Sequence, residues 1–324
     1  SNSGIDRIDF NNDTATASVK GSMATPSTSY EAGFGNLNYG YITGGQGSGP
    51  GSNPSNWATT SISRIDYSND ATAASPKGPF ASPKYFHAGV GNMDYGYSIA
   101  GRDFGYPGPN IYYSDISRKD YSNDTVAPPV KSNYPFEGPG QYGLSGTGNM
   151  EYGWIGGGSS NTTVCRIDYS NDTASPPLRT YLSDSNGNGR KCTGNSSFGY
   201  WQPKVTTRFT RIDYSNDTAT SVDKSTSTTP AYDNGSVTSK DYAYVYGLFY
   251  PYTSSVERLD YANDDIATTP KGPLTVTSGG GRHTGGTSAQ QFGLPTAPVP
   301  ATRTENYPAG FPFGYTSGGY DGSN

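Results

Sequence analysis

Short stretches of alternating apolar and polar residues recur along the chain. In one of the clearest, Ile65 and Tyr67 fall on one face of an extended segment, and Arg64 and Asp66 fall on the other. An alternation with a period of two predicts a β-strand that is buried on one side. Clusters of Gly, Pro, Asn, Asp and Ser separate these stretches, which is typical of tight turns between short strands. We therefore expect an all-β fold.

The stretch around Arg64 belongs to a repeat that begins Arg-x-Asp-aromatic and continues into Asn-Asp. Its copies begin at Arg7, Arg64, Arg118, Arg166, Arg211 and Arg258. Each Asn-Asp pair is followed about seven residues later by a basic residue, at Lys20, Lys77, Lys131, Arg179, Lys224 and Lys271. A period of about 50 residues is typical of the blades of a β-propeller.

A second motif, aromatic-Gly-aromatic and often followed by Gly-Gly, alternates with the first. Its copies begin at Tyr39, Tyr95, Tyr152, Phe198 and Phe313, with a degenerate copy at Tyr242. We predict that this motif forms the first strand of each blade and that Arg-x-Asp-aromatic forms the second. A third strand would follow the Asn-Asp turn, and segments such as Tyr85–Val90 would form the fourth.

The two motifs together predict one domain over residues 1–324, a six-bladed β-propeller with four antiparallel strands per blade. The predicted blades cover approximately residues 39–92, 95–149, 152–195, 198–240 and 242–311, and a sixth combines 313–324 with 1–36. In this last blade the C-terminal segment would supply the inner strand and the N-terminal segment the other three. Pairing between the two ends of the chain would close the ring and remove an open edge.

The motifs also carry a resemblance to known families. The Gly-Gly strand, the Asp-aromatic strand and the Tyr-x-His-Ala-Gly segment at Tyr85 are similar to kelch repeats. The segment Arg-Ile-Asp-Tyr-Ser-Asn-Asp-Thr-Ala-Thr at Arg211 resembles repeats in structural and tail-fibre proteins of marine and cyanobacterial bacteriophages. This resemblance covers nearly the whole chain. It implies a virion-surface, extracellular protein whose partners are other virion proteins and a host-surface glycan or protein.

Composition narrows the range of partners. The net charge is -5 and no basic tract is present, so we expect no nucleic-acid partner. No apolar run approaches the roughly 18 residues that a spanning helix needs, so we expect no membrane insertion. Cys165 and Cys192 should lie two strands apart in one blade, roughly 9–10 Å, whereas a disulfide needs Cα atoms within about 7 Å. We therefore expect two free thiols.

The sequence contains no recognisable catalytic or cofactor motif, because it lacks Gly-x-Ser-x-Gly, His-Glu-x-x-His and a phosphate loop. Carboxylate pairs such as Asp66 and Asp70 offer oxygen ligands that calcium prefers. Their presence in every blade favours a structural role instead, and we expect the repeated Arg and Lys to pair with the Asp of the same strand. His87 and His283 are too few for the copper site of kelch-like radical oxidases. We therefore predict no metal, no cofactor and no enzymatic activity.

The two faces of the predicted propeller differ. The Ser-Asn-Asp and Gly-Asn turns on one face are alike in every copy, whereas the connections on the other face differ in length and composition. Loops on a rigid scaffold often carry function, and aromatic rings suit sugar or protein surfaces. The candidate ligand-binding residues on these variable connections are Trp57, Phe104, Tyr106, Tyr112, Tyr113, Tyr134 and His283.

Two other functions remain open at this point. The chain could be a decoration or spacer protein whose loops only contact neighbouring subunits. It could also be a glycan-active enzyme, which would require two carboxylates about 5–10 Å apart in a pocket on the variable face.

Overall fold

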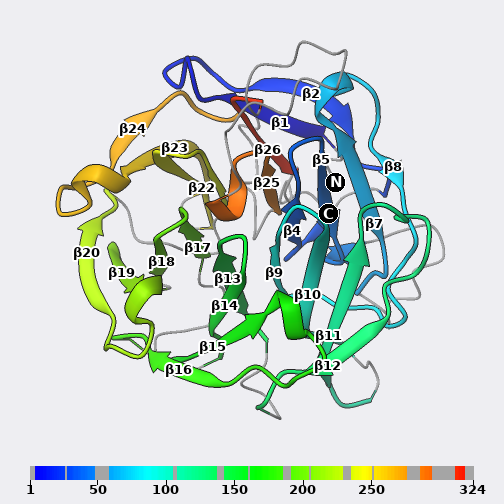
Figure 1. Cartoon of the computed structure of the whole chain (residues 1–324). Helices are drawn as coiled ribbons and strands as arrows, with labels where there is room; N and C mark the ends of the chain where they lie inside the picture. Colours follow the sequence, from blue (N-terminus) through cyan, green and yellow to red (C-terminus); the bar gives the residue numbers. More distant parts are fainter. Residues whose placement is uncertain are drawn as a thin grey trace, which may run out of the picture.

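The computed structural model describes residues 4–25, 28–47, 58–104, 108–136, 142–159, 161–184, 191–203, 206–228, 235–249, 252–275, 285–293 and 311–317. Six four-stranded antiparallel sheets are arranged in a ring around a central axis (Figure 1). The structure confirms the predicted six-bladed β-propeller. The described helices are single 3-10 turns, and none of them is long and apolar enough to cross a membrane.

The blades are named here in chain order, each from its innermost to its outermost strand. Blade 1 comprises β4 (Ala32–Gly35), β5 (Tyr39–Thr43), β7 (Ile62–Asp66) and β8 (Ser75–Pro76), and blade 2 comprises β9 (Ala88–Gly91), β10 (Tyr95–Asp103), β11 (Ile111–Asp120) and β12 (Val130–Asn133). Blade 3 comprises β13 (Leu144–Gly148), β14 (Tyr152–Gly157), β15 (Thr163–Asp168) and β16 (Leu178–Tyr181), and blade 4 comprises β17 (Lys191–Gly194), β18 (Phe198–Gln202), β19 (Arg208–Asp213) and β20 (Val222–Thr226). Blade 5 comprises β21 (Gly235–Thr238), β22 (Tyr242–Phe249), β23 (Tyr252–Asp260) and β24 (Thr269–Lys271), and blade 6 comprises β25 (Gly286–Ser288), β26 (Phe313–Ser317), β1 (Gly4–Asp9) and β2 (Ser18–Ser22). A small additional sheet pairs β3 (Thr28–Ser29) with β6 (Gln46–Gly47).

Each blade begins one strand earlier than predicted. The innermost strand is the segment exemplified by Ala88–Gly91, which the sequence interpretation placed fourth, and the Tyr-Gly-Tyr strand is second. The innermost strands crowd together at the axis, where a Cβ on Gly33 would lie 2.0 Å from the carbonyl oxygen of Gly286. The small residues of this segment are what that position requires.

Closure of the ring therefore divides blade 6 differently from the prediction. The C-terminal part of the chain supplies β25 and β26, and the N-terminal part supplies β1 and β2, instead of one strand and three. The antiparallel pairing of β1 with β26 runs from Ile5–Ser317 to Asp9–Phe313 and joins the two parts. This pairing confirms the prediction that N- and C-terminal strands pair. As a result, neither β1 nor β26 lies at an open edge of the sheet.

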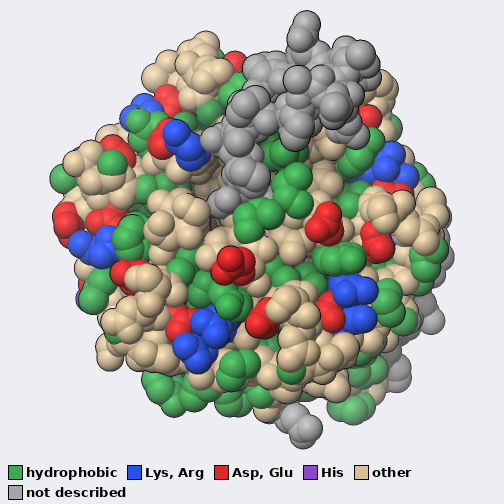
Figure 2. Space-filling model, viewed as in Figure 1, with side chains coloured by type: hydrophobic (Ala, Val, Ile, Leu, Met, Phe, Trp, Pro, Cys, Tyr) green, Lys and Arg blue, Asp and Glu red, His purple; other side chains and the backbone are tan. Residues whose placement is uncertain are grey.

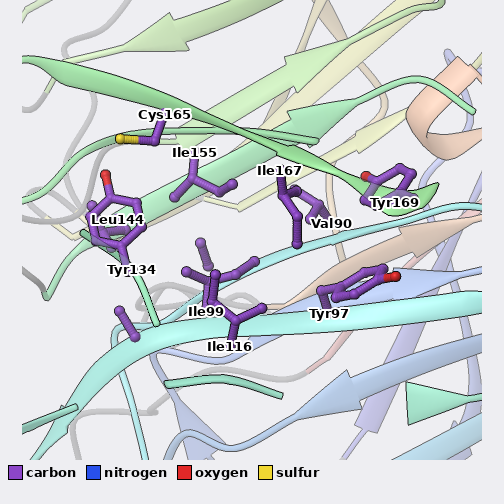
Figure 3. Close-up of a cluster of buried hydrophobic side chains, with 12 residues drawn as sticks. Val90, Tyr97, Ile99, Ile116, Tyr134, Leu144, Ile155, Cys165, Ile167 and Tyr169 are labelled. Atoms are coloured by element: carbon purple, nitrogen blue, oxygen red, sulfur yellow. The ribbon is translucent and has the colours of Figure 1, made fainter. Parts of the chain in front are cut away.

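Apolar side chains from neighbouring blades form the core between them. Figure 3 shows one such cluster, in which Ile99 and Ile116 of blade 2 face Ile155 and Ile167 of blade 3. All four side chains are almost completely buried. Burying this apolar surface is the main source of stability for a sheet-on-sheet interface of this kind.

A polar junction accompanies the apolar core at every blade boundary. Between blades 1 and 2, the Asp124 carboxylate accepts hydrogen bonds from the Tyr41 hydroxyl (2.9 Å) and the Arg64 guanidinium (2.8 Å). The Lys77 ammonium lies 3.2 Å from the other carboxylate oxygen. The Tyr41 ring also stacks on Tyr121, with ring centroids 5.0 Å apart. Three donors of one blade thus converge on a single carboxylate of the next.

The other five junctions repeat this arrangement around the ring. Their carboxylates belong to Asp13, Asp70, Asp172, Asp217 and Asp264. The pair between Arg258 and Asp13 (2.7 Å) joins blade 5 to the N-terminal part of blade 6, so the series of junctions is closed. In Figure 2, basic and acidic side chains lie next to one another at several positions around the ring.

The structure confirms a structural role for the repeated charges but corrects their partners. Arg64 pairs with Asp124 of the next blade and not with Asp66 of its own strand. Asp66 lies at the strand end, where its carboxylate caps the 3-10 turn η1 (Tyr67–Asn69) by accepting a hydrogen bond from the Ser68 N–H (2.9 Å). The same cap occurs at η3 (Tyr169–Asn171), η4 (Tyr214–Asn216) and η5 (Tyr261–Asn263).

Candidate binding face and axial cavity

The strand order places the two kinds of connection on opposite faces of the ring. The turns between the first and second strands and between the third and fourth strands lie on one face, called here the turn face. The Asn92 side chain accepts hydrogen bonds from the N–H groups of Asp94 (3.0 Å) and Tyr95 (2.9 Å), and Asn36, Asn149 and Asn195 form the same turn. The opposite face, called the loop face, carries the connections that differ from blade to blade.

A cavity of about 70 Å³ lies on the axis between the innermost strands. The side chains at its edge include Glu31, His87, Ser145, Lys191, Cys192 and Gln291. The turn η6 (Gln291–Gly293) lies against β13, β17 and β21 and contributes to a second, smaller cavity of about 10 Å³. The larger cavity has room for a few water molecules but is far smaller than the roughly 300 Å³ at which ordinary ligand pockets begin.

Glu31 at the edge of this cavity is 5% exposed and connects blade 1 to blade 6. One carboxyl oxygen accepts hydrogen bonds from the Ser317 hydroxyl and the Gly285 N–H (3.3 Å). Burial raises the pKa of this carboxyl to about 8, although both hydrogen bonds act in the opposite direction. Glu31 is the one carboxylate among the described residues that line the cavity, so the carboxylate pair of a glycosidase is not found there.

His87 takes the equivalent position in blade 2 and is also buried. The Thr43 hydroxyl donates its proton to the Ala32 carbonyl (3.1 Å), so its oxygen accepts the hydrogen bond from His87 Nε2 (3.0 Å). Burial, and secondarily the nearby charges of Lys84 and Lys191, lower the pKa of His87 to about 3. His87 is therefore a neutral side chain that joins two blades.

An aromatic cluster lies on the loop face where blades 1, 2 and 3 meet. We call it the Arg102 cluster, and its members are Tyr30, Tyr85, Phe86, Arg102, Tyr112 and Tyr142. The Arg102 guanidinium lies over the rings of Tyr142 (4.2 Å), Tyr85 (4.9 Å) and Phe86 (5.2 Å). All members except Tyr85 are partly exposed. Arginine over aromatic faces is a favourable cation–π arrangement.

Two further ring contacts extend the cluster to both sides. Tyr30 of blade 1 meets Phe86 with centroids 4.0 Å apart, and Tyr112 of β11 meets Tyr142 at 5.8 Å. The backbone of the cluster is tied across the blades, because the Phe86 N–H bonds the Tyr30 carbonyl (3.1 Å) and the Gly143 N–H bonds the Phe86 carbonyl (2.8 Å). The rings are therefore held on a fixed backbone and not on a free loop.

The structure brings together only part of the predicted binding set. Tyr112 belongs to the Arg102 cluster, and Tyr113 lies beside it on β11 with its ring 5.9 Å from the Lys84 ammonium. Phe104 is partly buried at the end of β10. Three further candidates, Trp57, Tyr106 and His283, lie outside the described residues.

The prediction that Tyr134 binds a ligand on the loop face is wrong, because Tyr134 is a core residue. It is 2% exposed and packs edge-on against Phe136, with centroids 5.7 Å apart. The predicted set did not include Tyr30 and Phe86, which lie just before the innermost strands, or Arg102, which lies near the end of β10. A signal was present, since Tyr30-Glu31-Ala-Gly and Phe86-His87-Ala-Gly align in consecutive repeats.

The repeated carboxylates and the two cysteines form no further site in the described part of the chain. No group of three or more His, Cys, Asp or Glu side chains there could hold a metal ion. Asp70, considered above as a calcium ligand, is paired with Arg7 (2.7 Å). Cys165 and Cys192 are free thiols, as expected, and burial raises the pKa of Cys165 to about 11.

Comparison with known proteins supports the fold and goes no further. No protein-family model and no curated protein sequence matches the chain. Among solved structures 404 chains match, including one described as "Structure of YjhT". That propeller protein aligns with a TM-score of 0.62 and 11% sequence identity, over 81% of this chain and 88% of its own. At this identity the likeness shows the propeller architecture alone.

Proposed function

We propose that the protein is a non-enzymatic surface component of a bacteriophage particle, of the tail-fibre or adhesin type. Its loop face would recognise a glycan or protein on the host surface. The observation that carries this proposal is the contrast between the two faces of the ring. The turn face repeats the same hydrogen bonds in successive blades, whereas the loop face carries partly exposed aromatic rings and connections that differ from blade to blade.

The rest of the molecule suits a recognition module. Six ionic junctions and the paired termini make a closed scaffold, and loops on such a scaffold can vary without disturbing it. The axial cavity is too small for a sugar ring, so a glycan would have to bind on the outer surface of the loop face. The resemblance of the sequence repeat at Arg211 to phage tail-fibre repeats favours a place on the virion.

A binding experiment with two matched variants tests the proposal. The purified chain would be applied to an array of bacterial surface glycans and to whole bacterial cells. We expect binding that falls at least tenfold in Tyr112→Ala on the loop face and is unchanged in Val126→Ala. Val126 is a suitable control because it is 53% exposed and follows the Asn-Asp turn on the opposite face.

Two outcomes would contradict the proposal. Binding that is lost equally in both variants would not come from the loop face. If the chain binds neither glycans nor cells but self-associates or joins virion proteins through its loop face, the spacer function is correct instead. Protection of Tyr112 and its neighbours from hydrogen exchange in that assembly would identify the buried face.

A further inference from the structure

We infer that the Arg102 cluster binds a sugar unit that bears a carboxylate, with the sugar ring against the aromatic side chains and the carboxylate on the Arg102 guanidinium. This inference rests on the proposed glycan recognition and specifies its ligand class. It assigns the site to the meeting point of blades 1, 2 and 3, away from the axial cavity.

The charge of Arg102 has no carboxylate partner among the described residues, which sets it apart from the other arginines there. Those eight each form an ion pair with an aspartate: Arg7, Arg64, Arg118, Arg166, Arg179, Arg208, Arg211 and Arg258. The neighbouring Lys84 is fully buried and paired with Asp115 at 2.6 Å. An arginine fork that is partly exposed and not neutralised is a favourable binding group for a carboxylate.

The rings around Arg102 give the site its shape. The Arg102 guanidinium lies over the adjoining rings of Tyr142 and Phe86, at 4.2 Å and 5.2 Å from their centroids, and these contacts orient it before a ligand arrives. Tyr30 and Tyr112 continue the aromatic surface on either side. Aromatic faces stack on the apolar faces of sugars, while the tyrosine hydroxyls can bond sugar hydroxyls. A neutral sugar would use the rings alone, and an acidic sugar would use the rings and the charge.

The backbone beneath two of these rings adopts a conformation that aromatic residues rarely take. Tyr30 has φ 65° and Phe86 has φ 56°, whereas the equivalent residue of blade 3, Gly143, has φ 75°. Glycine would satisfy this geometry without strain at all three positions. Strained residues of this kind concentrate at ligand-binding sites. Keeping bulky rings here is consistent with a requirement for them at the surface.

The test compares carboxylated glycans with matched neutral forms. Oligosaccharides of polygalacturonate, alginate and hyaluronan would each be titrated calorimetrically into the full chain as the free acid and as the methyl ester. We expect at least one free acid to bind tenfold or more tightly than its ester, because one charge-assisted bond accounts for about that ratio. Arg102→Gln should abolish the difference. Arg208→Gln, which removes an exposed arginine charge on blade 4, should preserve it.

The outcomes separate this inference from the proposed function. Glycan binding that depends on Tyr112 but shows no preference for the free acid would overturn the inference and leave the proposed function standing. A preference for the acid that survives in a folded Arg102→Gln variant would also overturn the inference. If no glycan binds in either form, glycan recognition itself is wrong. Should Arg102→Gln fail to fold, the unaltered chain still tests the inference, because equal binding of the free acid and the ester would overturn it.

Discussion

Removing one junction carboxylate should destabilise the propeller more than any single exposed substitution. Asp124→Ala deletes the acceptor for Tyr41, Arg64 and Lys77 at the boundary between blades 1 and 2. Only 7% of the Asp124 side chain is exposed, so water replaces the carboxylate poorly. Breaking a buried ion pair by removing one partner costs about 3–5 kcal/mol. That is a large share of the 5–15 kcal/mol by which proteins are ordinarily stable.

Equilibrium denaturation in guanidinium chloride, followed by far-UV circular dichroism and tyrosine fluorescence, would measure this loss. Asp120→Ala is the matched control in the same repeat, because the partly exposed Asp120 carboxylate caps a turn by accepting a hydrogen bond from the Ser122 N–H (2.9 Å). Loss of such a cap costs about 1 kcal/mol. Asp124→Asn should fall between the two, since it keeps an acceptor oxygen but loses the charge. Equal losses for Asp124→Ala and Asp120→Ala would refute the central role assigned to the junctions.

The remaining predictions concern pH and closure of the ring. Burial alone would raise the pKa of Asp124, but hydrogen bonds from Tyr41 and the charges of Arg64 and Lys77 outweigh it, so the pKa lies below 3.8. The resulting stability is present above about pH 4 and is lost as the pH falls through the lowered pKa. Asp124→Asn should therefore reduce the pH dependence of the free energy of unfolding measured between pH 5 and 2.5. The contribution of Glu31 to stability depends on pH in the opposite direction. Its pKa of about 8 in the folded state exceeds the ordinary 4.5, so this contribution is complete below pH 4.5 and declines as the pH rises to 8. Glu31→Gln should therefore unfold at a higher temperature than the unaltered chain at pH 9 but not at pH 4, and equal melting temperatures at pH 9 would count against the buried carboxyl. Truncation before residue 311 removes β26 and leaves β1 as an open edge, so we expect association in analytical ultracentrifugation and loss of a single cooperative melt.

The fold was largely predictable from the sequence, because six copies of two motifs with strand-like alternation leave few architectures. The boundaries of the blades were not, because a cyclic repeat has the same period wherever the unit is taken to begin. What decides the frame is crowding at the axis, where Gly33 meets Gly286. That contact joins segments from opposite ends of the chain, and a period does not reveal it.

The candidate site was less predictable than the fold. Tyr112 and Tyr134 both occur among the variable connections, but the first lies in a surface cluster and the second fills the core between blades 2 and 3. Their burial depends on the neighbouring blade and not on their own segment. The partner of Arg64 shows the same limit, because Asp124 lies 60 residues further along the chain. Residue type and spacing identified the repeated positions but not what each of them contacts.

The junctions between blades have a direction, and this has a consequence for how such a chain can change over generations. Every blade presents its donors on one side and its carboxylate on the other, so the ionic part of each boundary has the same direction all around the ring. Recombination between copies would exchange whole blades, together with their loops, and would keep the ionic part of each boundary matched. A chain built in this way can replace its recognition surface in units of one blade while its scaffold stays constant.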